Sequence, residues 1–300
     1  MKGNLQEIAT ARTPSQSSSP SKKRGAFLLP NYCLLPNVLA VDAAIFAAYW
    51  QVMVIQAFDL ETSWQRATLL AMAVWLGYAA DRWLDVIGMK NNPRTLRHKF
   101  AAQHCKSMLL AWAITVTGSV IAACNILSTK ELLAGFILAG LCICNAWLNH
   151  LDSKGHSPVP KELRAALLLA SGIHLFLWTQ LQETSFPFWS SFTAVTVMCF
   201  LNCCLVAKWE TRADLEQGQS SFALRHKRFK GNASAFTLSI ATLCSAIALL
   251  RTHDPDGLIL QATTVALLAL LILDRSNLAP EDKRALADAS LFLPCLLLVP

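Results

Sequence analysis

Charged residues are scarce in this sequence of 300 residues. Asp, Glu, Lys and Arg together make up 15% of the chain, whereas hydrophobic residues make up 54%. A soluble domain of this length needs more polar side chains than that to cover its surface. The composition therefore argues against an ordinary soluble fold and indicates a membrane protein.

Several chemical motifs are also missing. The sequence has no P-loop and no GxGxxG fingerprint, so it offers no nucleotide-binding turn. Its ten cysteines form no pair of CxxC units at zinc spacing, and most of them, such as Cys142, Cys144 and Cys199, lie inside apolar segments. We interpret them as small hydrophobic side chains between helices and expect no zinc site.

The first 30 residues differ from the rest of the chain. Residues 15–23 read SQSSSPSKK, which is too polar to bury enough surface for folding. No apolar core with a small-residue cleavage site precedes them, so we predict no secretory signal. We expect residues 1–30 to form a disordered cytoplasmic tail and residues 31–300 to form one transmembrane helical domain.

Long apolar blocks fill that domain. A membrane-spanning helix needs roughly 20 largely apolar residues. The blocks predict an all-α, polytopic membrane helix bundle of about nine spans, at 34–57, 66–86, 105–127, 131–150, 162–181, 188–208, 233–250, 257–273 and 285–299.

Basic residues alternate between the connections of these spans. All but three of the 26 Lys and Arg residues lie in the tail or in every second connection, and the exceptions are Arg66, Lys130 and Arg251. Such alternation is the positive-inside bias, so we predict a multi-pass protein with a cytoplasmic amino terminus. The formal charge of +7 then indicates anionic lipid headgroups as partners, and no nucleic acid.

Polar residues inside the spans gather in their cytoplasmic halves. They are Asp42, Asp81, Asp85, Asn145, Asn149, Asn202 and Glu210. A central Asp costs about 2.5–3.5 kcal/mol on insertion scales, so such residues need a reason to be there. The asymmetry suggests a polar cavity open to the cytoplasm, the alternative being interfacial side chains that reach water.

Two acidic pairs stand out at the ends of spans 2 and 6. Asp81 and Asp85 are four residues apart, as are Glu210 and Asp214, so each pair points two carboxylates from one helix face. Like charges at this spacing repel, and the carboxyl end of a helix disfavours anions. A Mg²⁺ ion would relieve both pairs. Alternatively, Arg82, Lys208 and Arg212 neutralise them locally.

The same basic signature follows each acidic pair. Residues 96–100 read LRHKF and residues 224–229 read LRHKRF. Four spans separate the two units, so both have the same direction across the membrane, as in a parallel internal repeat. The two acidic helix ends and two basic loops could then face one cavity suited to a metal–diphosphate, with Lys and Arg on the phosphate oxygens.

At these residues the sequence resembles the UbiA-type superfamily of intramembrane prenyltransferases, over residues 31–300. The family's first motif, NDxxDxxxD, is similar to GYAADRWLD at 77–85, with Gly77 and Tyr78 in place of Asn and the first Asp. Its second motif, DxxDDxxxGxxS, is matched by Glu210, Asp214, Gly218 and Ser221, with Ala213 in place of one Asp. The YPxxK element before helix 5 is matched at Pro158 and Lys161, and an RT element at 94–95.

The resemblance implies a nine-helix, UbiA-like bundle that moves a prenyl group from a prenyl diphosphate to a lipophilic acceptor. It implies a catalytic site at Asp81, Asp85, Glu210 and Asp214, which would hold Mg²⁺ through the diphosphate, and diphosphate binding by Lys161 and Arg94. Two alternatives stay open. The substituted motif positions are also typical of a non-catalytic relative that binds a lipid or a membrane partner, and the internal repeat with a polar cavity also occurs in transporters.

Overall fold

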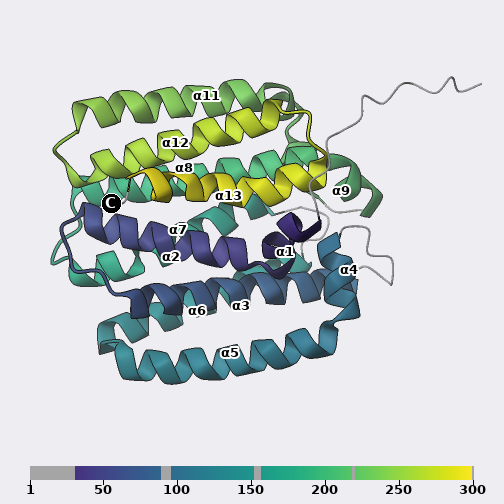
Figure 1. Cartoon of the computed structure of the whole chain (residues 1–300), viewed down its shortest axis with the longest axis horizontal. Coiled ribbons are helices and arrows are strands. Elements are labelled where there is room, and N and C mark those ends of the chain that lie inside the picture. The colour runs from purple at the N-terminus through teal and green to yellow at the C-terminus, as the bar shows by residue number, and fades with distance from the viewer. Residues whose placement is uncertain (1–30, 89–95, 152–156, 218–219, 299–300) are drawn as a thin grey trace, which may run out of the picture.

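The computed structural model describes residues 31–88, 96–151, 157–217 and 220–298, and these ranges consist of helices joined by short connections, with no β-strand among them. The long helices lie side by side along the long axis of the molecule (Figure 1). The expectation of an all-α fold is confirmed.

Each apolar block of the sequence coincides with a long helix, or with a pair of helices for the first block. The long helices are α2 (Val41–Ala57), α3 (Trp64–Gly88), α5 (Cys105–Ile126), α6 (Thr129–Leu151), α7 (Lys161–Gln180), α8 (Phe186–Trp209), α11 (Lys227–Leu250), α12 (Pro255–Arg275) and α13 (Pro280–Leu298). The shorter ones are α1 (Asn31–Leu39), α4 (Leu96–Gln103), α9 (Thr211–Gln217) and α10 (Phe222–Arg225).

The basic stretches expected as loops are largely helical. The LRHKF stretch forms the start of α4, and the LRHKRF stretch runs from α10 into α11. Sequence patterns of apolar spans did not indicate these helices because they are short and carry many charges.

The first span is broken between α1 and α2. Ala40 adopts the left-handed conformation, with φ of 58°, which ends the regular helix there. The guanidinium of Arg82 in α3 donates to two carbonyls of the last turn of α1, those of Asn37, at 2.6 Å, and Val38. A helix end leaves its last carbonyls without intrahelical partners, so Arg82 stabilises the break by satisfying them.

The buried core is formed chiefly by α2, α7, α8, α12 and α13. Trp50, Met198 and Leu267 from three of these helices are fully buried in it. The Trp50 indole also donates to the carbonyl of Leu291, at 2.8 Å, and so ties α2 to α13. The core therefore joins the first of the long helices to the last.

The helices α5 and α6 present their apolar side chains outward. Leu110, Ile114, Phe136 and Ile143 are each at least 64% exposed. A continuous apolar surface of this kind is unfavourable in water and favourable in contact with lipid chains. The outer face of these two helices is thus consistent with a membrane protein.

Within the described residues, five helices are long and apolar enough to cross a membrane. They are Cys105–Ile126, Thr129–Asn149, Phe186–Trp209, Lys227–Leu250 and Pro255–Arg275. The apolar helix Val41–Ala57 is shorter. The structure thus supports several spans, while the count of nine and the UbiA-like topology stay predictions.

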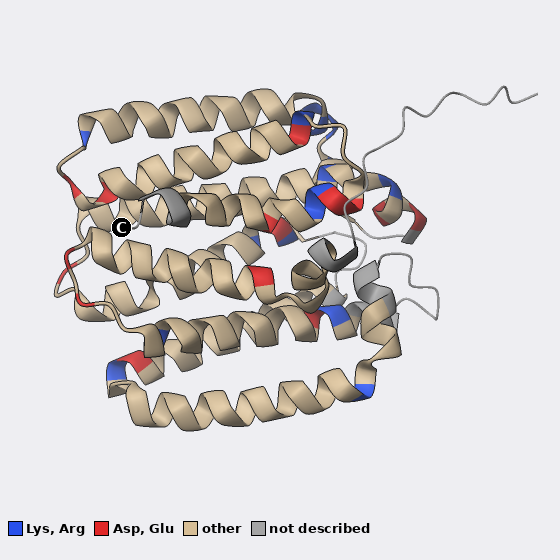
Figure 2. Ribbon diagram, in the orientation of Figure 1, with Lys and Arg blue, Asp and Glu red and all other residues tan. Residues whose placement is uncertain are grey.

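Charged residues lie mainly at the two ends of the bundle, and more of them at the end that carries α9 and α4 (Figure 2). The middle of the bundle is largely without them. At the opposite end, Arg66 of α3 forms an ion pair with Glu131 of α6, at 2.8 Å. This distribution fits helices that place their polar ends in the two interfaces.

Candidate functional site

A small cavity lies between α2, α3, α7, α8 and α13. Its polar or polarisable lining consists of Tyr78, Cys199, Asn202, Cys203 and Asp288, and Ala, Leu and Phe side chains form the rest. The cavity measures about 20 Å³, which is room for one water molecule or one hydroxyl group. Residues that are far apart in the sequence, from α2 to α13, thus line one mostly apolar cavity.

A chain of carboxylates and amides crosses four helices beside this cavity. The Asn37 amide donates to Asp42, at 2.9 Å, and lies 3.5 Å from Asp288. The Asn202 amide donates to the other carboxylate oxygen of Asp288, at 3.1 Å. Asn37 and Asp288 thus connect Asp42 with Asn202, two of the polar residues that the sequence analysis singled out, while a polar cavity open to the cytoplasm stays a prediction.

The side-chain oxygen of Asn202, in this series of hydrogen-bonded side chains, has no donor among the described residues. Asn202 is buried, with 7% of its surface exposed, and its amide nitrogen is bonded to Asp288. Its Oδ1 atom is fully buried and, among the described residues, accepts no hydrogen bond. A buried carbonyl oxygen without a donor costs about 1–3 kcal/mol, so a molecule that donates to it would be stabilised here.

The predicted acidic ends of α3 and α8 lie at the same end of the bundle, because the two helices run in the same direction (Figure 1). Asp81 is exposed on α3. Asp85 belongs to the same helix, but its side chain lies outside the described residues. Glu210 follows α8 directly, and Asp214 lies half-buried on α9.

Glu210 is engaged by a residue that is distant in sequence. Its carboxylate accepts a charge-assisted hydrogen bond from Arg284 of α13, at 2.6 Å. The sequence had offered Lys208 and Arg212 as local neutralising groups, but these pair with Asp274 and Glu216 instead. The Asp214 amide nitrogen donates to the Glu210 carbonyl, at 2.9 Å, so the one-turn spacing of the acidic pair survives the end of α8.

Carboxylate oxygens suit Mg²⁺ in their donor chemistry. Across the parts of the chain that the structure describes, no group of three or more His, Cys, Asp or Glu side chains is arranged to hold a metal ion.

The second predicted feature, a diphosphate-binding lysine, lies at the same end. Lys161 begins α7 and is half-buried. Nearby, Arg164 donates to Asn149 at 2.6 Å and to the hydroxyl of Ser157 at 2.8 Å, and Arg225 donates to the Ser157 carbonyl at 3.1 Å. These contacts bring basic residues of α7 and α10 together. The other predicted diphosphate ligand, Arg94, lies outside the described residues.

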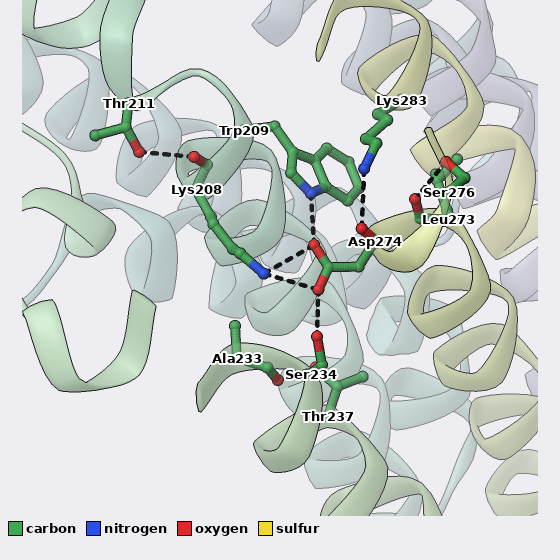
Figure 3. A network of polar contacts seen from close by, with 10 residues as sticks. All are labelled: Lys208, Trp209, Thr211, Ala233, Ser234, Thr237, Leu273, Asp274, Ser276 and Lys283. Atoms are coloured by element: carbon green, nitrogen blue, oxygen red, sulfur yellow. Dashed lines mark hydrogen bonds and ion pairs between the residues drawn. The ribbon is translucent and has the colours of Figure 1, made fainter. Parts of the chain in front are cut away.

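A dense polar network holds the neighbouring helices together (Figure 3). The buried carboxylate of Asp274 accepts from Lys208 at 2.8 Å, from the Trp209 indole at 2.8 Å and from the Ser234 hydroxyl. Lys283 donates to the Asp274 carbonyl at 2.9 Å. Burial lowers the pKa of the Lys283 ammonium, and the charge of Asp274 opposes that shift. The network joins α8, α11, α12 and α13.

Sequence reasoning missed three participants of the polar region: Asn37, Asp288 and Arg284. Asp288 was an acidic residue inside a predicted apolar span, which is itself a signal of function in a membrane helix. Asn37 lies inside the predicted span 34–57 and carried a weaker form of the same signal, whereas Arg284 lies outside the predicted spans and gave none.

None of the family models, curated proteins or solved structures compared with the chain matches it. Its function must therefore be argued from the site itself.

Proposed function

We propose that this protein is a Mg²⁺-dependent intramembrane prenyltransferase of the UbiA type. The supporting observation is that α3 and α8, which carry the two acidic motifs, line one cavity through Tyr78 and Cys203. At a rise of about 1.5 Å per residue, Asp81 lies about 4.5 Å beyond Tyr78, and Glu210 lies roughly 10 Å beyond Cys203. Both acidic ends thus stand on the same side of a shared cavity.

In this proposal the charged end binds the diphosphate and the apolar bundle holds the prenyl chain. Asp81, Asp85, Glu210 and Asp214 would hold Mg²⁺ through the diphosphate, and Lys161 and Arg94 would hold phosphate oxygens. The bound ion would neutralise charge on the leaving diphosphate. The apolar walls of the cavity would keep water away from the reacting carbon.

Product formation tests the proposal. Purified protein is incubated with labelled prenyl diphosphates and a panel of lipophilic acceptors, with and without Mg²⁺. We expect a metal-dependent product that Asp81→Asn and Asp214→Asn reduce by at least about 100-fold, as for loss of one charge-stabilising group. The matched control is Asp59→Asn, because Asp59 is also exposed but lies beyond α2, at the opposite end of the bundle. The proposed enzymatic function is refuted if product formation falls equally in all three variants, or if the unsubstituted protein forms no product.

A non-catalytic lipid-binding protein is the second candidate. It is favoured by the ion pair between Glu210 and Arg284 and by Tyr78, which lines the cavity where the resemblance expects an Asp. Saturable binding of isoprenoids that is indifferent to Mg²⁺, together with no transfer of the prenyl group, would establish this candidate.

We also propose that the end carrying α4 and α9 faces the cytoplasm and contacts anionic lipid headgroups. The supporting evidence is the alternation of Lys and Arg along the sequence. Cys105 is exposed at the start of α5, near this end. In a variant that retains only Cys105, a membrane-impermeant maleimide should label inverted vesicles and leave right-side-out vesicles unlabelled. The reverse pattern would invert the topology.

A further inference from the structure

The cavity between α2, α3, α7, α8 and α13 has a polar lining to which Asn202 and Asp288 contribute hydrogen-bond acceptors. Asn202 contributes its buried Oδ1 atom, which has no donor among the described residues, and Asp288 contributes a carboxylate. The Asn202 nitrogen donates one of its two N–H groups to Asp288, at 3.1 Å. A ligand that donates a hydrogen bond would therefore satisfy the Oδ1 atom of Asn202.

The rest of the lining is apolar. It includes Phe46, Ala166, Leu169 and Leu291, of which Ala166 and Leu291 are almost completely buried. The space of about 20 Å³ admits a single hydroxyl group, while a ring would require the helices to separate. An ammonium group would lose far more hydration energy than a neutral hydroxyl on entering such surroundings.

We infer that this cavity binds the hydroxyl group of a slender, lipophilic alcohol, which donates its proton to Oδ1 of Asn202. The alkyl part of the alcohol extends out of the cavity, because the cavity has room for the hydroxyl group alone. Tyr78 marks the entrance, since it lines the cavity and is still 37% exposed. If the proposed prenyl transfer holds, the bound alcohol is its acceptor, and this last step alone rests on the proposed function.

The test compares two probes that differ in one donor. Binding of 1-decanol and of decyl methyl ether to the purified full-length chain is measured from the rise of the unfolding midpoint with probe concentration. Asn202→Leu should weaken decanol binding by about three- to tenfold, the loss expected for one hydrogen bond. It should leave binding of the ether unchanged, because the ether has no proton to donate.

Asn145→Leu is the matched control, because Asn145 also has a buried Oδ1 without a donor in the described chain but does not line the cavity. It should change the affinity for neither probe. Ala166→Val, which fills the cavity without removing a polar group, should weaken decanol binding as well. Equal losses for both probes in Asn202→Leu, or decanol binding that survives both Asn202→Leu and Ala166→Val, overturn the inference.

The two proposals fail separately. A protein that transfers prenyl groups but does not distinguish decanol from its ether lacks the hydroxyl site and keeps its enzymatic role. A protein that distinguishes the probes but forms no prenylated product keeps the hydroxyl site and loses the enzymatic role.

Discussion

Replacement of Asp274 by Asn should destabilise the bundle strongly, because its carboxylate accepts hydrogen bonds from two other helices, α8 and α11. The Asp274 side chain is 3% exposed and its ion-pair partner Lys208 is 23% exposed. Removing one partner of a buried ion pair costs about 3–5 kcal/mol, and the access of Lys208 to water reduces this to about 2–4 kcal/mol. The substituted amide can still accept from the Trp209 indole, so the loss falls on the contacts with Lys208 and Ser234.

The assay is thermal unfolding of the purified protein at a fixed scan rate. At roughly 2 °C per kcal/mol for a chain of this size, the midpoint should fall by about 4–8 °C. Glu216→Gln is the matched control, because it removes a carboxylate from the ion pair with Arg212, whose side chain is 92% exposed. Such a surface pair contributes about 0–1 kcal/mol, so its midpoint should move by no more than about 2 °C.

A double variant separates the charge from the packing. Lys208→Met combined with Asp274→Asn should lose less stability than the two single changes added together, because neither charge is then left without the other. The reasoning is refuted if Asp274→Asn shifts the midpoint no more than Glu216→Gln does. It is also refuted if the two single losses are simply additive.

Two further changes test the helix contacts. Ser191→Ala should lower the free energy of unfolding by about 1–3 kcal/mol. The hydroxyl of Ser191 lies 2.9 Å from Nε2 of the buried His174, and without it this nitrogen atom would lack a partner. An unchanged unfolding midpoint would show that this bond contributes nothing to stability. Gly257→Ala should lower the free energy of unfolding by about 1–3 kcal/mol, because the new Cβ would lie 2.1 Å from the Arg251 carbonyl oxygen. Gly118→Ala is the control and should be neutral or stabilising, because open space surrounds Gly118. Equal effects of the two changes would contradict the close approach at the turn before α12.

Much of the helical architecture could be read from the sequence. The block at 188–208 predicts α8 within two residues at each end, because a long apolar run is a local property of the chain. The break at Ala40 was not predictable in the same way. Arg82, which stabilises the interruption by donating to the carbonyls of Asn37 and Val38, lies two helices later in the sequence.

The candidate site was predicted only in part. Asp42 and Asn202 were recognised as polar residues in apolar helices, and both belong to the chain of hydrogen bonds beside the cavity. Asp288, which connects them, was overlooked. The partner of Glu210 was expected among its neighbours, yet Arg284 is 74 residues away. The assignment of Mg²⁺ and of a prenyl diphosphate stays a prediction.

The sequence by itself determined that apolar helices dominate this protein and where its costly polar groups stand along them. Hydrophobicity and charge act residue by residue, so their pattern is visible before folding. Only the tertiary structure decided which polar groups meet. Hydrogen bonds and ion pairs reach no more than a few ångströms. The packing of α13 against α1 and α8 is what brings Asp288 to Asn37 and Asn202, and Arg284 to Glu210.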